Sequence, residues 1–278
     1  MRPGIFAKTF PRPTLEESLD AVVACGVQAI QFNLALTGGP SLPAGVAPDV
    51  AAGVVAAART RDLEMSAVSG TYNMAHPDAG VRADGRRRLA ALIEAAPALG
   101  TAVVTVCTGS RDPEDMWRRH PGNASAEAWA DMVASLTHAL EVAEAHDVTL
   151  GIEPEHNNVV SSAAAARRLL DDLSSPRVKV VLDAANLIEP GALDRQDRTL
   201  REAFDLLGGD LALAHAKDVT PDGRVVAAGR GALDYPLYVD LLRDAGFGGA
   251  LVLHGLAEDE VAGSVAFVRA ALDRAPAG

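Results

Sequence analysis

The sequence predicts an α/β fold, a (β/α)8 or TIM barrel formed by a single domain over residues 1–278. Eight short apolar runs alternate with helical patterns along the chain. Strict alternation of strand and helix indicates a parallel sheet. No spare strand is evident among the eight repeats, which favours a closed barrel over an open doubly wound sheet. The length also suits one barrel, and no linker or low-complexity tract divides it.

The expected strands are short runs dominated by Val, Ile, Leu and Ala. Such nearly continuous apolar runs are typical of parallel strands that are buried on both faces. The expected strands are 4–10, 27–34, 63–73, 101–109, 148–155, 178–187, 211–219 and 250–256.

The helical patterns between the strands carry clear boundary signals. Thr14 with Glu17 three residues later predicts a capping box, and Gly26 predicts the end of that helix. Pro48 marks the first turn of the next helix, whereas Pro97 should disturb the last turn of the third. The expected helices are 14–26, 48–62, 80–100, 125–147, 161–175, 197–209, 234–247 and 259–275.

Two loops stand out between these elements. The longest irregular stretch is 108–125, and loops of that length often serve as functional lids. The segment "GRGALDY" at 229–235 has glycines, but it is too short for a dinucleotide-binding or phosphate-binding fingerprint. We expect a flexible loop there that leads into a helix.

The composition narrows the functional class. A net charge of −12 argues against a nucleic-acid partner, which would need clustered Lys and Arg. The chain has no apolar run long enough for a membrane span and no signal-peptide pattern at its start. Cys25 and Cys107 lie far apart without metal-type spacing. A cytoplasmic location and small core cysteines are therefore expected.

Polar residues end four successive strands at similar depth. They are Glu153, Asp183, His215 and His254. The carboxyl ends of barrel strands meet at one face, where these side chains would converge. Two carboxylates and two imidazoles at one point are costly without a cation. Carboxylate oxygens and imidazole nitrogens suit Mn, Zn, Co or Mg, so the sequence predicts one divalent metal ion there.

Further polar residues near these strand ends complete the expected site. Lys217 follows His215 by two positions and faces the same way, so catalysis and a salt bridge to Glu155 are both open. Glu155 shares the face of Glu153 and is either a substrate contact or part of a rim ion pair. For His254, ligation and a role as base or hydrogen-bond partner are equally open. The other expected substrate contacts are Lys8, His76, Arg111 and Asn186.

At these residues the chain resembles the xylose isomerase-like TIM barrels of the sugar phosphate isomerase/epimerase superfamily. The resemblance covers essentially the whole chain and is most specific at "GIEPE", "VVLDAANL", "HAKD" and "GRGALDYPLYVDLLRDAGFGGALVLHG". It implies that the strand-5 Glu, strand-6 Asp and strand-7 His bind one divalent metal together with a strand-8 Glu. Carried over, the ligands are Glu153, Asp183 and His215.

Two positions depart from that family pattern. His254 stands where the strand-8 Glu is expected, and Asn186 stands where epimerases often have a His. In the family's ketose epimerases the strand-5 and strand-8 glutamates exchange protons with the sugar carbon. The departures therefore put the two-glutamate epimerase mechanism in question and leave isomerase and lyase chemistry open.

The leading functional hypothesis is a divalent-metal-dependent isomerase or epimerase acting on a sugar, keto-sugar or polyol through an enediolate. Glu153 would ligate and act as base, and His254 or Lys217 would serve as the second acid or base. The alternatives are a lyase or dehydratase on a keto-sugar or inosose, and a non-catalytic sugar-binding barrel. An apurinic-site endonuclease on this scaffold would need more His ligands and a basic surface. Self-association into a homo-oligomer is possible for such barrels.

Overall fold

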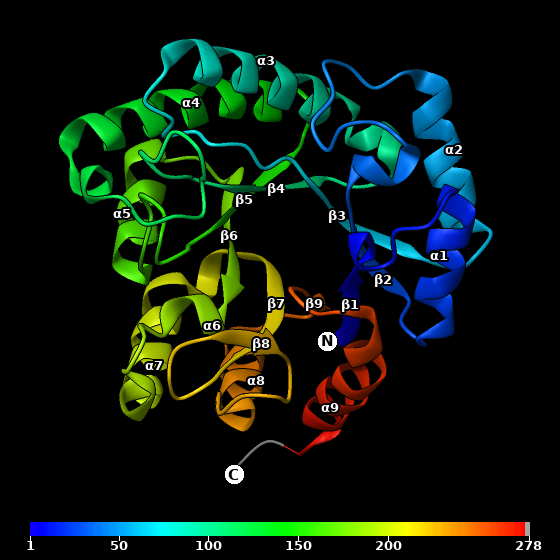
Figure 1. Cartoon of the computed structure of the whole chain (residues 1–278), viewed down its shortest axis with the longest axis vertical. Coiled ribbons are helices and arrows are strands. Elements are labelled where there is room, and N and C mark those ends of the chain that lie inside the picture. Colours follow the sequence, from blue (N-terminus) through cyan, green and yellow to red (C-terminus); the bar gives the residue numbers. More distant parts are fainter. Residues whose placement is uncertain (276–278) are drawn as a thin grey trace.

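Eight parallel strands form a closed ring in the computed structural model, which describes residues 1–275 (Figure 1). The ring consists of β1 (Arg2–Phe6), β2 (Ala29–Phe32), β3 (Glu64–Ser69), β4 (Val103–Cys107), β5 (Thr149–Glu153), β6 (Val178–Asp183), β7 (Leu211–Val219) and β9 (Ala250–Leu253). Each strand pairs in parallel with the next, and β9 pairs with both β7 and β1 to close the barrel. The predicted barrel and its eight strands are confirmed.

One strand was not expected. β8 (Val225–Ala227) pairs antiparallel with the end of β7, so the expectation of no spare strand is wrong. β7 is nine residues long and continues beyond the barrel rim. A tight turn then reverses the chain, with the Thr220 amide donating to the carbonyl of Arg224 at 2.9 Å. β8 lies outside the ring and leaves the eight-stranded barrel intact.

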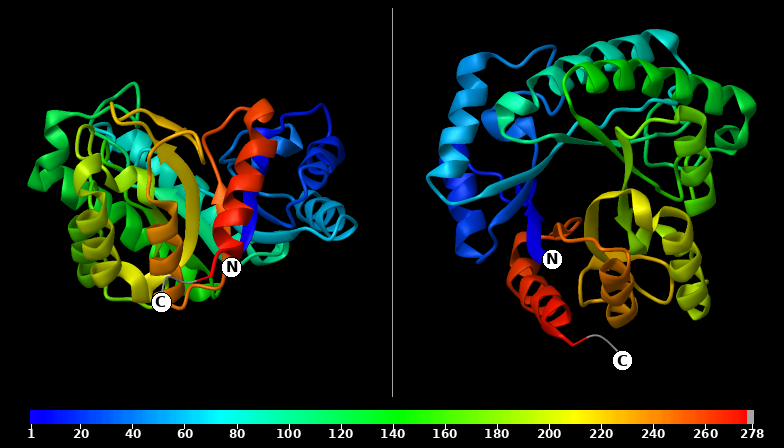
Figure 2. Two further views of the ribbon diagram at one scale, coloured as in Figure 1. Left: turned by 90° about the horizontal axis from the view of Figure 1, so that it is seen from below. Right: turned by 180° about the vertical axis from the view of Figure 1, so that it is seen from behind.

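Helices surround the strand ring, as the right-hand view of Figure 2 shows. The main ones are α1 (Leu15–Ala24), α2 (Pro48–Arg59), α3 (Ala79–Ala95), α4 (Ala126–Ala145), α5 (Ala163–Leu173), α7 (Gln196–Leu207), α8 (Tyr235–Asp244) and α9 (Val261–Asp273). Shorter segments are α6 (Ala184–Leu187) and the 3-10 turns η1 (Ala7–Thr9), η2 (Leu34–Thr37), η3 (Pro97–Leu99), η4 (Pro121–Ala124), η5 (Leu193–Arg195), η6 (Gly208–Asp210) and η7 (Glu258–Glu260). Within residues 1–275, none of the helices has the length and hydrophobicity of a bilayer span.

The boundary signals in the sequence are found in the structure. Thr14 and Glu17 make the reciprocal bonds of a capping box at the start of α1. α2 begins at Pro48. α3 ends at Ala95, and the chain continues as the 3-10 turn that begins at Pro97, because proline cannot donate an α-helical hydrogen bond.

The interior of the barrel is layered along its axis. Its lower part is a dry cluster of small and branched side chains, made by Ala29, Ala67, Val181, Leu213, Ala250 and Val252. Side chains on a strand alternate faces, so the residue two positions later points inward again, one layer higher. In that higher layer Ala29 is followed by Gln31, Val181 by Asp183 and Leu213 by His215. The apolar layer therefore forms a floor beneath a polar layer at the carboxyl end of the strands.

Helix α8 holds two of the strands that carry the polar layer. The Tyr238 hydroxyl lies 2.9 Å from the carbonyl oxygen of Leu182 and 3.1 Å from that of His215. The Tyr235 hydroxyl donates to the carbonyl of Lys217 at 2.7 Å. Both tyrosines are buried, so these bonds fix the ends of β6 and β7 relative to each other.

The absence of a side chain at Gly151 is a packing requirement of the barrel. A Cβ there would lie 2.8 Å from the Cγ2 atom of Val181 on the neighbouring strand. We predict that Gly151→Ala lowers the free energy of unfolding by about 1–3 kcal/mol. The matched change Gly53→Ala, where a Cβ on α2 meets nothing within 4 Å, should instead raise it by up to about 1 kcal/mol. Urea denaturation of both variants checks this, and equal stabilities would contradict it.

Candidate metal centre and active site

Three predicted ligands converge at the top of the barrel. One donor atom from each of Glu153, Asp183 and His215 lies within 4.8 Å of the other two. The Nδ1 atom of His215 is 3.1 Å from Oε1 of Glu153 and 3.8 Å from Oδ2 of Asp183. Parallel pairing places Asp183 opposite His215, and β5 delivers Glu153 from the other side. The structure thus brings these three residues within reach of one ion.

The donor set fits a divalent cation. Two carboxylate oxygens and one imidazole nitrogen are the donors that Zn²⁺, Mn²⁺ and similar ions take in catalytic sites with an open position. Oδ2 of Asp183 is buried and receives no hydrogen bond of good geometry, although the Lys217 ammonium approaches it to 3.1 Å. Glu153, Asp183 and His215 are the residues that would hold the ion.

Lys217 supplies positive charge beside the two carboxylates. Its Nζ atom lies 3.1 Å from Oδ2 of Asp183, 3.7 Å from Oε1 of Glu153 and 3.1 Å from Oδ1 of Asn186. Asn186 in turn donates to Oε1 of Glu153 at 2.8 Å. Asn186 therefore connects the lysine and the glutamate, and Lys217 pairs with the predicted metal ligands instead of Glu155.

The charges at this site are strongly coupled. Burial would raise the pKa of Glu153, but the neighbouring His215 and Lys217 outweigh it and hold that pKa well below its usual range. Burial would lower the pKa of Lys217, and here Asp183 and Glu153 outweigh it and raise that pKa. At neutral pH the site therefore holds an ionised Glu153 and a charged Lys217.

His254 lies beside the ligand group without belonging to it. Its ring stacks parallel on the His215 ring at a centroid distance of 5.1 Å, and on its other side it stacks on Phe6 at 5.1 Å. Burial lowers the pKa of His254 to about 3, and His215 and Lys217 add to this effect. A neutral imidazole with Nδ1 buried and without a hydrogen-bond partner therefore faces the site. The structure places it as a neighbour of His215, not among the converging donors.

A cavity of about 400 Å³ opens above these residues. Its polar floor includes Gln31, Glu153 and Lys217, and its walls include Phe6 and Trp117. A volume of this size lies within the range of small-molecule sites. The combination of aromatic walls and a charged floor suits a polar ligand that has apolar faces.

Glu155 and Lys8 line the same cavity, as the sequence predicts for substrate contacts. Burial raises the pKa of Glu155 to about 7, against the opposing effect of Lys217. Its closest basic partner is His156, whose Nδ1 lies 3.4 Å from Oε1 of Glu155. Lys8, on η1, is exposed at the cavity and makes no ion pair within the described residues.

The structure does not bring His76 and Arg111 to the cavity. Nε2 of His76 lies 3.1 Å from the carbonyl oxygen of Pro113, and its Nδ1 accepts the amide of Asp78. Arg111 is buried and forms an ion pair with Asp131 of α4 at 2.8 Å. Both residues therefore fasten the loops that follow β3 and β4.

The loop at 108–125 covers one side of the cavity. Met116 and Trp117 at its tip line the cavity wall. Asn158, just after β5, holds the loop by accepting the amide of Gly109 at 2.8 Å and donating to the carbonyl of Met116 at 3.1 Å. The expected lid is thus a wall with internal hydrogen bonds, and the second amide of "EHNN" serves to position it.

The Xylose isomerase-like TIM barrel model matches residues 19–271. The chain belongs to the xylose isomerase-like TIM barrel family. No curated protein sequence matches it closely enough to count as a relative.

Solved structures share this fold at low sequence identity. A 3-keto-D-glucoside 4-epimerase from E. coli is 19% identical, with 97% of this chain and 99% of that chain covered and a TM-score of 0.74. A D-tagatose 3-epimerase-like protein is 15% identical, with 98% and 97% covered and a TM-score of 0.77. The IOLI protein with a binding zinc atom is 16% identical, with 98% of each chain covered and a TM-score of 0.73.

The sequence did not predict several residues that line the cavity of this xylose isomerase-like barrel. Phe6, Thr105, Met116 and Trp117 line the cavity but sit within apolar runs or an irregular loop. The Cys107 thiol faces Oε2 of Glu153 at 3.8 Å, although the sequence suggested only a core residue. Gln31 also lines the cavity, and the sequence predicted no role for it. A polar residue within an otherwise apolar strand is the signal that would have found Gln31 and Thr105.

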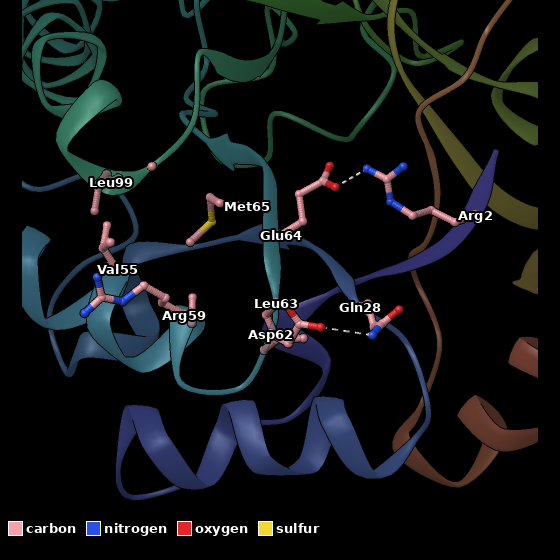
Figure 3. A pocket seen from close by; sticks show the side chains of 11 residues that line it. Arg2, Gln28, Val55, Arg59, Asp62, Leu63, Glu64, Met65 and Leu99 are labelled. Carbon is pink, nitrogen blue, oxygen red and sulfur yellow. Dashed lines mark hydrogen bonds and ion pairs between the residues drawn. The ribbon is translucent and has the colours of Figure 1, made fainter.

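A larger cavity lies at the other end of the barrel, where β1 and β3 begin (Figure 3). It measures about 520 Å³ and has apolar walls that include Val55, Leu63 and Leu99. Its acidic groups are already engaged, because Glu64 pairs with Arg2 and Asp62 accepts from Gln28. Among the described residues the only converging group of metal donors is the one at the carboxyl end. We therefore place the chemistry in the smaller cavity, as is general for these barrels.

Removing the charge of Lys217 should show how strongly the fold depends on a cation beside the two buried carboxylates. We predict that Lys217→Met lowers the free energy of unfolding in EDTA by about 3–5 kcal/mol, because two buried carboxylates lose their cation. A divalent ion should restore part of the loss. Lys179→Met is the matched control, since the partly exposed Lys179 pairs with Asp210 at the surface and should cost at most about 1 kcal/mol. Equal losses for the two variants, measured by denaturant titration, would refute this assignment.

Proposed function

We propose that this protein is a divalent-metal-dependent isomerase or epimerase that acts on a sugar, keto-sugar or polyol through an enediolate-type intermediate. The observation that carries the proposal is the convergence of Glu153, Asp183 and His215 next to a cavity of about 400 Å³, which Glu153 lines. Three ligands leave coordination positions free for a substrate carbonyl and a neighbouring hydroxyl.

The comparisons support this class of reaction. Two of the similar structures are named as a 3-keto-D-glucoside 4-epimerase and a D-tagatose 3-epimerase-like protein, and a third contains zinc. Epimerisation beside a carbonyl requires removal and return of a carbon-bound proton. The charged floor of the cavity has the groups for such a transfer.

The chemistry divides between the ion and the side chains. A bound divalent ion supplies Lewis-acid polarisation of the substrate carbonyl. Glu153, ionised in the site, takes the proton from the adjacent carbon. Lys217 on β7 and His254, directly after β9, also line the cavity. They act as acid or base at the substrate oxygen and at the opposite face of the substrate. Proton return to the opposite face of the same carbon gives an epimer, and return to the neighbouring carbon gives the ketose–aldose isomer.

The cavity walls provide for substrate binding. Phe6 and Trp117 offer apolar surfaces for the C–H faces of a sugar, and Trp117 is 46% exposed. Glu155, Asn33 and Lys8 offer groups for its hydroxyls. We propose a small polyhydroxylated substrate on this basis.

The runner-up is a lyase or dehydratase acting on a keto-sugar or inosose. It is favoured by His254, an imidazole where the family's epimerases carry a second carboxylate base. After proton abstraction by Glu153, elimination needs an acid that protonates a departing hydroxyl, which the charged Lys217 supplies, rather than a second base for the same carbon. Product analysis separates the two, since elimination releases water and creates an unsaturated or deoxy product, whereas isomerisation conserves the formula.

The proposed function is tested with metal analysis and a substrate panel. We expect about one divalent ion per chain, turnover of at least one ketose, inosose or 3-keto-sugar, and solvent deuterium at the reacting carbon. Chelation should remove most activity and lower the melting temperature modestly, because an ion bound only by the folded state adds stability by mass action. A protein that binds sugars but shows neither turnover nor deuterium exchange when metal-loaded would be a non-catalytic barrel.

His254 should matter for turnover more than for metal content. We expect His254→Ala to reduce kcat on the substrate identified by the panel by at least about tenfold. The ion should be retained, because the three converging ligands remain. His138→Ala, a change at an exposed position on α4, is the control and should leave kcat unchanged. Wild-type kcat in His254→Ala would show that this imidazole has no part in the reaction.

A further inference from the structure

Gln31 makes a hydrogen-bonded link between the ligand His215 and the far wall of the barrel. Its Oε1 lies 2.7 Å from Nε2 of His215, and its Nε2 donates to Oγ1 of Thr105 at 3.0 Å. All three residues are almost completely buried, with exposures of 3%, 1% and 3% for Gln31, His215 and Thr105. The side chain thus joins β2 to β7 on one side and to β4 on the other.

A buried glutamine in this strand is not explained by packing. β2 reads "AIQF", and the other three residues are apolar and buried. Gln31 points inward directly above Ala29, which belongs to the dry floor of the barrel. Burying an amide costs free energy unless its hydrogen bonds are made, and here both ends are satisfied by two specific partners.

The link bears on which nitrogen of His215 is free to bind an ion. A neutral imidazole carries one N–H and one acceptor nitrogen. Nδ1 faces the carboxylates of Glu153 and Asp183, and Nε2 faces Gln31. If the proton is on Nε2, Nδ1 offers its lone pair to an ion held by the two carboxylates. If the proton is on Nδ1, it points at Glu153 and ligation is blocked.

We propose that Gln31, oriented by Thr105, is the positioning residue that selects the ligating tautomer of His215. With its amino group directed to the Thr105 hydroxyl, Gln31 presents a carbonyl oxygen, which only accepts, to Nε2 of His215. That arrangement places the proton on Nε2 and frees Nδ1. Outer partners of metal-binding histidines typically fix the tautomer and ring orientation and alter metal affinity by roughly 10- to 100-fold. The inference rests on the metal site of the proposed function.

Gln31 and Thr105 also line the cavity, so contact with substrate is the competing explanation. Turnover alone does not separate the two roles. Metal affinity and the tautomer of His215 do, because neither depends on substrate.

The test is calorimetric titration of Zn²⁺ into the metal-stripped full chain, with four variants. We expect Gln31→Met, similar in size but without an acceptor, to weaken Zn²⁺ binding roughly 10- to 100-fold. Gln31→Glu, which only accepts from Nε2 when ionised, should bind Zn²⁺ at least as tightly as wild type. Thr105→Val should weaken binding by a smaller factor, and Thr105→Ser, which keeps the hydroxyl, should not. Thermal unfolding of each metal-free variant verifies that it is folded.

Two-dimensional ¹⁵N–¹H spectra of the histidine rings give the second readout. We expect His215 to carry its proton on Nε2 in wild type and in Gln31→Glu, and to lose this preference in Gln31→Met. Wild-type Zn²⁺ affinity in Gln31→Met, or equal weakening in Gln31→Glu and Gln31→Met, would overturn the inference while leaving the proposed function standing.

Failure of the proposed function is distinguishable from failure of this inference. Wild-type protein that binds no Zn²⁺ or other divalent ion would sink the metal-dependent function. The histidine ring spectra of the metal-free protein would then test the role of Gln31 separately. A proton on Nε2 of His215 would support that role, and a proton on Nδ1 would overturn it. If Gln31→Met fails to fold, the comparison of Thr105→Val with Thr105→Ser and of Gln31→Glu with wild type decides in its place.

Discussion

The site depends on one electrostatic constraint, which is that two carboxylates are held together away from water. Asp183 is 1% exposed and Glu153 is 8% exposed, and both lie within reach of the same imidazole nitrogen. Like charges this close repel each other strongly in a medium of low dielectric constant. Lys217 and a hydrogen bond from Asn186 offset that repulsion, and a divalent ion would do so more completely.

The rest of the barrel serves to keep these groups in place. The apolar layer of small side chains beneath them separates the polar residues from the rest of the barrel interior. Tyr238 fixes the ends of β6 and β7 through the carbonyls of Leu182 and His215. Asp218 accepts the amides of Gly229 and Leu233 and so holds the loop that leads into α8. The "HAKD" motif thus combines a candidate metal ligand, a cation and a loop anchor on one strand.

Much of this arrangement could be predicted from the sequence, and the reason is periodicity. Alternating apolar runs and capped helices are local signals, so the barrel and its eight strands are confirmed almost element by element. Glu153, Asp183 and His215 end strands at matched depth, which parallel pairing converts into proximity. By contrast, His76 and Arg111 lie on loops, where sequence position says little about direction, and the structure uses both to fasten loops. β8 was missed because it has only three residues, too few to show a periodic pattern. It pairs with the end of β7, which the sequence did not suggest.

The roles of Gln31, Asn186 and His254 depend on distances that no pattern encodes. Asn186 bonds Glu153 and Lys217, and its expected contact with substrate stays a prediction. His254 was expected among the ligands or as an acid or base; its ring lies stacked on His215 outside the converging donors, and its role as acid or base stays a prediction. In each case the alternatives differ by only a few ångströms of side-chain position, which is below what strand register alone resolves.

Anomalous diffraction from crystals soaked in Mn²⁺ tests the central claim most directly. The account predicts one strong anomalous peak in each chain, bonded to Glu153, Asp183 and Nδ1 of His215 at about 2.0–2.3 Å, with His254 outside bonding distance. It also predicts that the Lys217 ammonium stays close to Asp183 or Glu153. A site without a peak, in which the ammonium of Lys217 alone bridges the two carboxylates, would contradict it.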